Sequence, residues 1–307
     1  MGEKKANLPS GLQHKDINKI RSNFYSLLEN KKPILVPGAV NALSAKLIKE
    51  AGFDSLFITG AGLANSEYGL PDIGLLSLTD ICLESSKILD ATDLPAIIDA
   101  DTGYGGPLSV MRTVHKFELL GAAAIQLEDQ VMPKRCGHFD NKSVIDCESM
   151  VQKLIAAQEA RSDPKLAIIA RTDARSVNGL DDAIQRGIAY AEAGADAIFV
   201  EAPQTVEELE AIGLALKGIP LVVNVVEGGK TPQLSLQDYE DMGFKIVLYA
   251  NLLLRAMLFS GQSALKHLKD NGTSEGFQKH ILPWSERQNL VELDLYDETA
   301  NRYPESI

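Results

Sequence analysis

Residues 95–121 read PAIIDADTGYGGPLSVMRTVHKFELLG, and this stretch holds the unit from which the fold is predicted. It opens with a short, continuously apolar run that ends in acids, which is typical of a buried parallel strand. A glycine-rich turn follows, and residues 109–120 then place apolar side chains at helical spacing. Gly121 comes next, and glycine readily ends a helix in the left-handed conformation. The stretch therefore predicts one β-strand followed by one α-helix.

The same pattern occurs eight times along the chain. The predicted strands are 33–40, 55–62, 95–103, 123–130, 166–174, 197–203, 220–228 and 245–251. The predicted helices are 42–50, 78–92, 109–120, 147–162, 180–192, 205–216, 235–242 and 252–269. Eight consecutive βα units predict an α/β fold, a (β/α)8 TIM barrel. A doubly wound open sheet is the alternative fold, but the glycine-rich phosphate turn expected of it is missing from Pro37-Gly38-Ala39-Val40.

Sequence remains at both ends of the predicted barrel. We expect a single domain over residues 1–307, with the barrel over about 30–260 and a C-terminal helical extension over about 261–307. Residues 2–29 are predicted to form a helix that caps the barrel bottom. The extension holds the lone Trp284 and a helical stretch near 285–298. It is predicted either to pack on a neighbouring subunit or to cover the outside of the barrel.

Composition narrows the function classes. The 307 residues are 45% hydrophobic and carry a net charge of −12, which argues against nucleic-acid binding because that needs basic surfaces. Three cysteines imply no disulfide framework and fit a reducing compartment. The first residues lack the apolar core of a signal peptide, and no apolar run approaches the ~20 residues of a membrane span. We therefore expect a cytoplasmic protein without nucleic-acid or membrane partners.

Polar residues gather where the predicted strands end. They are Thr59, Asp99, Asp101, Glu128, Asp129, Arg171, Asp173, Glu201, Asn224 and Glu227. In a barrel these ends share one face, and that face holds the active site. A single polar strand end is explained by contact with water, but convergence from six strands favours a site.

Asp99 and Asp101 predict a metal site. Residues two apart share one face of a strand, and all-oxygen ligation is preferred by Mg²⁺, with Mn²⁺ as a substitute. Glu128 is placed to hold the waters of the metal. No histidine lies at these strand ends, which disfavours Zn²⁺. The alternative is that the two aspartates accept hydrogen bonds from loop amides.

Cys136 lies in the segment Lys134-Arg135-Cys136-Gly137-His138. Neighbouring cations lower the pKa of a thiol, and His138 is placed as a proton partner. Buried, inert cysteines are common, an interpretation that suits Cys82 and Cys147 better.

Three further groups predict an anionic ligand. Arg171 offers a fork for a carboxylate, although an ion pair with Asp173 or Glu201 would also explain it. Asn224 offers a donor to another carboxylate. Thr59 with the amides of Gly60 and Ala61 suits an anionic oxygen.

These residues resemble the isocitrate lyase and phosphoenolpyruvate mutase superfamily over nearly the whole barrel. The resemblance rests on Thr59-Gly60-Ala61-Gly62, Gly69-Leu70-Pro71-Asp72, Asp99–Gly105, Glu128-Asp129-Gln130, Lys134–His138, Ala170–Ala174, Glu201-Ala202-Pro203 and residues 224–232. The Lys-Arg-Cys-Gly-His segment is similar to that of the carbon–carbon lyase branch. Phosphonate mutases and hydrolases of the superfamily generally lack this cysteine.

The resemblance implies a Mg²⁺-dependent retro-aldol cleavage of a 2-hydroxy acid. Mg²⁺ would lie near Asp99 and Asp101, with Asp72 and Glu128 in its water shell. Thr59, Gly60, Ala61 and Arg171 would hold the keto-acid product. Cys136 would protonate the other product, supported by His138, Glu201 and Asn224, and Lys134–His138 would form a mobile gate. Lys134 is thereby counted among the catalytic residues and Gly137 among the substrate-binding residues. A homotetramer of helix-swapped dimers is implied as well.

The substrate stays open between two groups of relatives. Methylisocitrate lyases place a hydroxyl where Val226 stands, and a Tyr is common in the family where Phe57 stands. Both changes look more like the branch of dimethylmalate lyase and oxaloacetate acetylhydrolase. Arg255 resembles methylisocitrate lyase and would receive a third carboxylate. The expected products are pyruvate with propionate or succinate. The alternatives are hydrolysis of oxaloacetate to oxalate and acetate, phosphonate P–C chemistry, or a barrel that only binds a metabolite.

Overall fold

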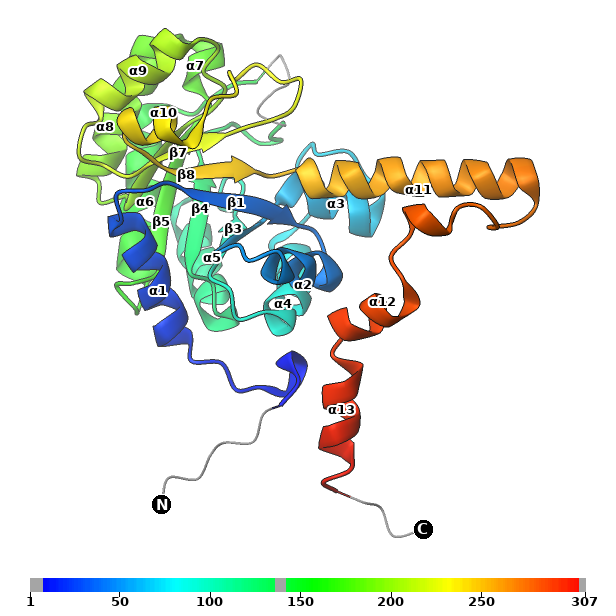
Figure 1. Cartoon of the computed structure of the whole chain (residues 1–307). Coiled ribbons are helices and arrows are strands. Elements are labelled where there is room, and N and C mark those ends of the chain that lie inside the picture. The colour runs from blue at the N-terminus through cyan, green and yellow to red at the C-terminus, as the bar shows by residue number, and fades with distance from the viewer. Residues whose placement is uncertain (1–7, 136–141, 304–307) are drawn as a thin grey trace.

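The structure is a computed structural model and describes residues 8–135 and 142–303. Eight parallel strands close into a barrel in which each strand pairs with the next and β1 pairs with β8 (Figure 1). The strands are β1 Ile34–Ala39, β2 Leu56–Ile58, β3 Ala96–Asp99, β4 Ala124–Glu128, β5 Ala167–Thr172, β6 Ala197–Val200, β7 Leu221–Asn224 and β8 Phe244–Tyr249. The predicted (β/α)8 barrel is confirmed.

Helices surround the barrel and continue beyond it. They are α1 Ile17–Glu29, α2 Ala42–Glu50, α3 Gly60–Tyr68, α4 Leu78–Ala91, α5 Pro107–Leu120, α6 Cys147–Ala160, α7 Ala174–Val177, α8 Leu180–Glu192, α9 Val206–Ala215, α10 Leu236–Asp241, α11 Leu252–Asn271, α12 Trp284–Leu290 and α13 Leu293–Ala300. Two short 3-10 turns are η1 Ser10–Leu12 and η2 Gln278–His280. The predicted helices 42–50 and 180–192 have the observed bounds, and the other six differ by one or two residues at an end.

Several predicted elements extend too far. The strands predicted over 95–103 and 220–228 end at Asp99 and Asn224. The strand predicted over 55–62 ends at Ile58, because Thr59 caps a helix by accepting a hydrogen bond from the Gly62 amide at 3.2 Å. Of the helix predicted over 2–29, residues 2–7 lie outside the described residues. Within residues 8–29 the α-helix begins only at Ile17, because Asp16 caps it by accepting from the Lys19 amide at 3.1 Å. Capping side chains thus set the last two boundaries where the apolar pattern did not.

The barrel interior and the bottom helix share one apolar core. Phe24 and Leu28 of α1 pack with Val36, Phe57 and other inward residues of the strands. Arg21 donates to the carbonyl of Ala122 at 2.9 Å, just before β4 begins. Helix α1 therefore closes the N-terminal end of the barrel, as predicted, and the C-terminal end is left for the site.

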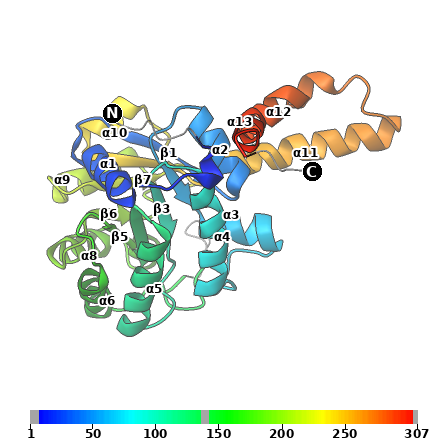
Figure 2. The same cartoon turned by 90° about the horizontal axis from the view of Figure 1, so that it is seen from below.

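Helix α11 projects from the barrel, and the helices after it return. Both views show α11 pointing away from the barrel and the chain then turning back through α12 and α13 (Figures 1 and 2). Glu292, between α12 and α13, forms an ion pair with Lys46 of α2 at 2.5 Å. Within α11 the buried residue is Leu254, whereas Phe259 and Leu265 are about 70% exposed (72% and 69%). The boundary predicted near residue 260 lies inside this continuous helix.

Candidate active site

A cavity of about 470 Å³ lies at the C-terminal ends of the strands. The predicted polar residues that line it come from the ends of β2 to β7, so the predicted convergence is observed. The lining residues are Phe57, Thr59, Ala61, Asn65, Pro71, Asp72, Asp99, Gln126, Glu128, Lys134, Arg135, Arg171, Phe199, Glu201, Asn224, Val226, Leu248, Ala250, Asn251, Leu254, Arg255 and Leu258.

Lys134 is held by the predicted metal-binding acids. Its ammonium group forms ion pairs with Asp72 and with Asp101, the latter at 2.8 Å. Burial alone would lower the pKa of Lys134, but the charges of Asp101 and Glu128 raise the pKa well above its usual value. The lysine that the sequence assigned to catalysis is therefore a cation inside the acidic cluster.

A turn brings Asp99 and Asp101 together. The prediction that both share one face of a strand is wrong, because β3 ends at Asp99 and Asp101 has a left-handed backbone with φ 46°. The amide of Asp101 donates to Asp99 Oδ1 at 3.2 Å. Asp99 Oδ2 also accepts from the amide of Gly60, at 3.3 Å. Both aspartates are buried beside the start of α3.

The cluster carries more negative charge than Lys134 balances. Burial raises the pKa of Asp101 to about 6, with Asp99 adding to the rise and Lys134 opposing it. Burial also raises the pKa of Glu128 well above its usual value, against the charge of Arg171. Glu128 Oε1 has no hydrogen-bond partner among the described residues. An additional cation at this position would relieve both effects.

These observations fit a hydrated Mg²⁺ ion. Across residues 8–135 and 142–303, no three acidic, histidine or cysteine side chains form a ready-made metal-binding group. Mg²⁺ usually keeps several waters and takes one or two protein carboxylates, so it does not need such a group. The residues that would hold it are Asp99 and Asp101, with Asp72 and Glu128 able to bind its waters.

Arg171 is fixed by carboxylates on one side and an aromatic ring on another. Its Nε and Nη2 donate to Asp173 at 2.9 and 3.1 Å, and Nε lies 3.3 Å from Glu128 Oε2. Its Nη1 is 3.8 Å from Glu201 Oε2, and the guanidinium carbon is 5.2 Å from the Phe199 ring centroid. The ion pairs considered from sequence exist, and the guanidinium still lines the cavity.

Part of the cavity lining is apolar. Phe57, Val226 and Leu258 belong to it. Arg255 lines the cavity too, but its Nη1 donates to the carbonyl and to Oε2 of Glu227 at 2.9 and 3.1 Å. The positive charge predicted to receive a third carboxylate is therefore paired with an acid.

The segment that carries Cys136 is anchored at both of its ends. Before it, the side-chain amide of Gln130 bonds the backbone of Arg135 twice, at 2.8 and 2.9 Å. After it, Lys142 forms a buried ion pair with Asp173 at 2.6 Å. The predicted residues Cys136, Gly137 and His138 lie outside the described residues.

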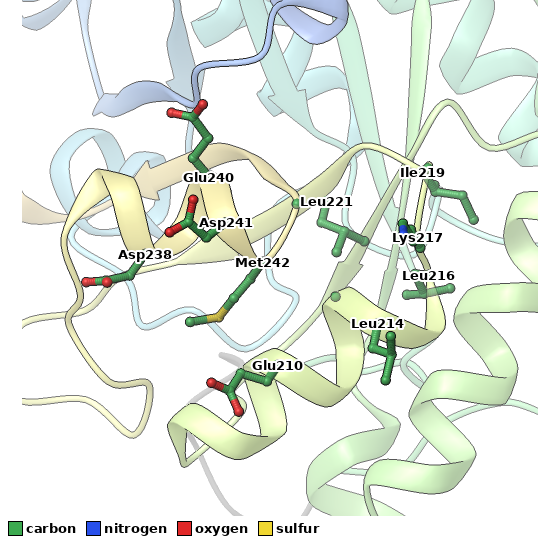
Figure 3. A pocket seen from close by; sticks show the side chains of 13 residues that line it. Glu210, Leu214, Leu216, Lys217, Ile219, Leu221, Asp238, Glu240, Asp241 and Met242 are labelled. Carbon is green, nitrogen blue, oxygen red and sulfur yellow. The ribbon is translucent and has the colours of Figure 1, made fainter.

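A larger groove lies at the opposite end of the barrel. It measures about 550 Å³ and is bordered by α9 and α10, near the starts of β7 and β8. Figure 3 shows Glu210 and Leu214 of α9 on one side of it and the segment with Asp238 and Met242 on the other. This end of a TIM barrel serves stability rather than catalysis, so size alone does not select the site.

The family follows from comparison with known proteins. The family model described as phosphoenolpyruvate phosphomutase matches residues 24–269. The chain belongs to this family. It is 41% identical over 277 residues to 2,3-dimethylmalate lyase of Eubacterium barkeri, covering 90% of this chain and 96% of that protein. It is 40% identical over 259 residues to 2-methylisocitrate lyase of Shewanella oneidensis, covering 84% and 87%.

Solved structures agree. The crystal structure of 2,3-dimethylmalate lyase, a PEP mutase/isocitrate lyase superfamily member, has a TM-score of 0.86 at 33% identity, covering 94% of this chain and 96% of that one. Oxaloacetate acetylhydrolase with 3,3-difluorooxalacetate has a TM-score of 0.86 at 32% identity, covering 96% and 98%. Phosphonopyruvate hydrolase with oxalate and Mg²⁺ has a TM-score of 0.84 at 29% identity, covering 92% and 98%.

These relatives confirm two predictions made from the sequence. The superfamily is the predicted one, and the enzyme class is that of a carbon–carbon lyase. Among the described helices, none combines the length and apolar character that crossing a membrane requires.

Two further residues belong to the site or its support and carry no clear signal in the sequence: Gln126, which lines the cavity, and Lys142, which lies outside it. Gln126 lies two residues before Glu128 on β4 and lines the cavity. Its position in a strand that ends in a predicted site acid was the available signal. Lys142 had no local signal, because its role depends on a contact with Asp173, which follows β5.

Proposed function

We propose that this chain cleaves the C2–C3 bond of a 2-hydroxy di- or tricarboxylate in a Mg²⁺-dependent retro-aldol reaction. The observation that carries the proposal is the pairing, in one buried cavity, of an acidic cluster suited to a hard cation with the guanidinium of Arg171. A 2-hydroxy acid presents both a chelating oxygen pair and a carboxylate, so it suits both halves of the site. The products would be pyruvate with propionate or succinate.

The chain's own residues bind and orient the substrate. Arg171 donates to a substrate carboxylate, and Asp173 fixes the plane of its guanidinium through two hydrogen bonds. Asn224, at the end of β7, has a buried Oδ1 without a partner among the described residues and faces the second half of the substrate. Glu201, also buried, holds the other side of Arg171. Closure of the cavity would exclude water.

The reaction removes one proton from the substrate, delivers one proton to it, and moves the electron pair of one bond. The hydroxyl proton leaves, the C2–C3 bond breaks, C2 becomes the ketone of pyruvate, and C3 receives a proton. Bound Mg²⁺ would supply positive charge to stabilise the oxygen of the forming keto acid. Cys136 is proposed as the acid that protonates C3, with His138 beside it and Gly137 contacting substrate, and these three roles rest on the sequence alone.

The cavity wall favours a methyl-bearing dicarboxylate. Val226 and Phe57 offer no polar group to a third carboxylate, and the charge of Arg255 is paired with Glu227. A 2,3-dimethylmalate-like substrate therefore suits this wall better than 2-methylisocitrate.

Oxaloacetate hydrolysis is the second candidate. The same two apolar residues, Val226 and Phe57, resemble oxaloacetate acetylhydrolase, and the structure of that enzyme is similar to this chain. Phosphonate P–C chemistry is a weaker third candidate, on the basis of phosphonopyruvate hydrolase at 29% identity.

A panel of substrates tests these candidates. Product release is measured with Mg²⁺ from 2,3-dimethylmalate, 2-methylisocitrate, oxaloacetate and phosphonopyruvate, with pyruvate and oxalate assayed separately. Pyruvate with propionate from dimethylmalate is the expected result. Oxalate released without pyruvate would refute the lyase activity and support oxaloacetate hydrolysis. Release of pyruvate and phosphate from phosphonopyruvate, with no other substrate consumed, would refute both activities.

We further propose a homotetramer built from helix-swapped dimers. The support is α11, which projects from the barrel with Phe259 and Leu265 exposed, followed by Trp284 at 71% exposure (Figure 1). Such apolar area is costly in water unless a second copy covers it. Sedimentation should give a tetramer, and a monomer at micromolar concentration would contradict the proposal. The cytoplasmic location and the single domain over residues 1–307 stay predictions.

A further inference from the structure

Gln126 has a buried side chain whose polar atoms are unused. It lies in the middle of β4 and is 1% exposed, and it lines the active-site cavity. Neither its Nε2 nor its Oε1 has a hydrogen-bond partner among the described residues. A buried amide without partners is unfavourable, and such groups are rare in proteins. The side chain is therefore suited to a partner that a ligand supplies.

The strand register places Gln126 on the cavity floor. It pairs with Asp99 on β3, and Glu128 lies two residues further along β4. Residues two apart in a strand point to the same side, so Gln126 lies one step deeper in the barrel than Glu128. The amide thus faces the space between the acidic cluster and Arg171.

Its neighbours have simpler hydrogen-bonding properties. Carboxylates such as Asp99 only accept, and the cations Lys134 and Arg171 only donate. The amide of Gln126 does both, through the Nε2 hydrogens and Oε1. Asn224, the amide that the sequence identified, lies across the barrel on β7.

We propose that Gln126 is a substrate-binding residue that recognises the hydroxyl group of a 2-hydroxy carboxylate. Its Oε1 accepts from the hydroxyl, and its Nε2 donates to the adjacent carboxylate. A 2-keto acid has no hydroxyl to donate, so it leaves Oε1 without a partner. Gln126 thus favours a 2-hydroxy acid over a keto acid or an acid without the hydroxyl. This inference rests on the proposed substrate class and adds the residue that selects it.

The test compares two dicarboxylates that differ in one hydroxyl. Dissociation constants of malate and succinate are measured by calorimetry for the full chain with Mg²⁺ present. The variant is Gln126→Met, which keeps the volume and removes both polar atoms. Gln152→Met, on the exposed face of α6, is the matched control. The hydroxyl group of malate can chelate Mg²⁺ in wild type and in both variants alike. A change in the ratio of the malate and succinate dissociation constants therefore reports the contribution of the Gln126 side chain alone.

We expect wild type and Gln152→Met to bind malate more tightly than succinate by the same factor. In Gln126→Met that factor should fall about tenfold, because malate binds more weakly while the dissociation constant of succinate changes little. A change of less than twofold, or a wild type without preference for malate, overturns the inference. Should Gln126→Met not fold, as judged by circular dichroism, Gln126→Leu replaces it and both criteria apply to that variant. A wild type that releases no pyruvate while the preference still falls would refute the lyase proposal and leave this inference intact.

Discussion

Replacing Asp173 with asparagine is expected to destabilise the protein by about 3–5 kcal/mol, because a buried carboxylate that binds two cations is lost. Asp173 is fully buried (0% exposed) and accepts from Arg171 at 2.9 and 3.1 Å and from Lys142 at 2.6 Å. Burial acts to raise the pKa of Asp173, but the charges of Arg171 and Lys142 lower it from 3.8 to about 2. That shift of the pKa alone corresponds to roughly 2 kcal/mol of the free energy of unfolding. The variant also leaves two buried cations without their carboxylate, which increases the loss.

The sign of the pH dependence follows from the same shift. Because folding lowers the pKa of Asp173, its contribution is fully present above the unfolded value of 3.8 and is lost as the pH falls toward 2. Urea unfolding at pH 7 and pH 5 should therefore give the same difference between wild type and Asp173→Asn. The control is Asp270→Asn, which removes the exposed ion pair with Lys266 on α11 and should cost under about 0.5 kcal/mol. The reasoning would be refuted if Asp173→Asn lowered the free energy of unfolding by less than about 1 kcal/mol. It would also be refuted if the difference between wild type and variant seen at pH 7 were absent at pH 5.

Three further changes test the site and the barrel. Cys136→Ser should abolish cleavage while Mg²⁺ binding persists, measured by product release and by metal titration, and normal turnover would exclude the thiol as the acid. Asp99→Asn should raise the Mg²⁺ concentration needed for half-maximal release by about tenfold or more, whereas an unchanged requirement would exclude Asp99 from the metal site. Phe24→Ala should lower the free energy of unfolding in urea by about 3–5 kcal/mol, because the ring is fully buried between α1 and the strands, and a loss below about 1 kcal/mol would contradict that packing.

Much of the fold was predictable because its determinants are local. Continuous apolar runs and helical spacing identify eight βα units, and residues such as Gly121 mark where helices end. The errors arise where a side chain changes the backbone path. Thr59 begins a helix directly after β2, and small residues such as Gly60 gave no apolar period to reveal it.

The site was predictable to the extent that strand ends converge. Asp99, Glu128 and Arg171 were identified because parallel strands present their C-terminal residues to one cavity. The pairing of Lys134 with Asp72, and of Lys142 with Asp173, depends on contacts between distant segments, so sequence spacing does not encode it. Gln126 was overlooked because an amide inside a strand resembles an ordinary polar residue until its missing partners are known.

The most direct test of the central claim is pyruvate release from 2,3-dimethylmalate before EDTA treatment, after it, and after Mg²⁺ is restored. The acidic cluster around Asp99 and Asp101 predicts that release stops with EDTA and returns with Mg²⁺. Pyruvate and propionate should appear in equal amounts. Release that continues undiminished in EDTA, or substrate consumption without pyruvate, would contradict a Mg²⁺-dependent carbon–carbon lyase at this site.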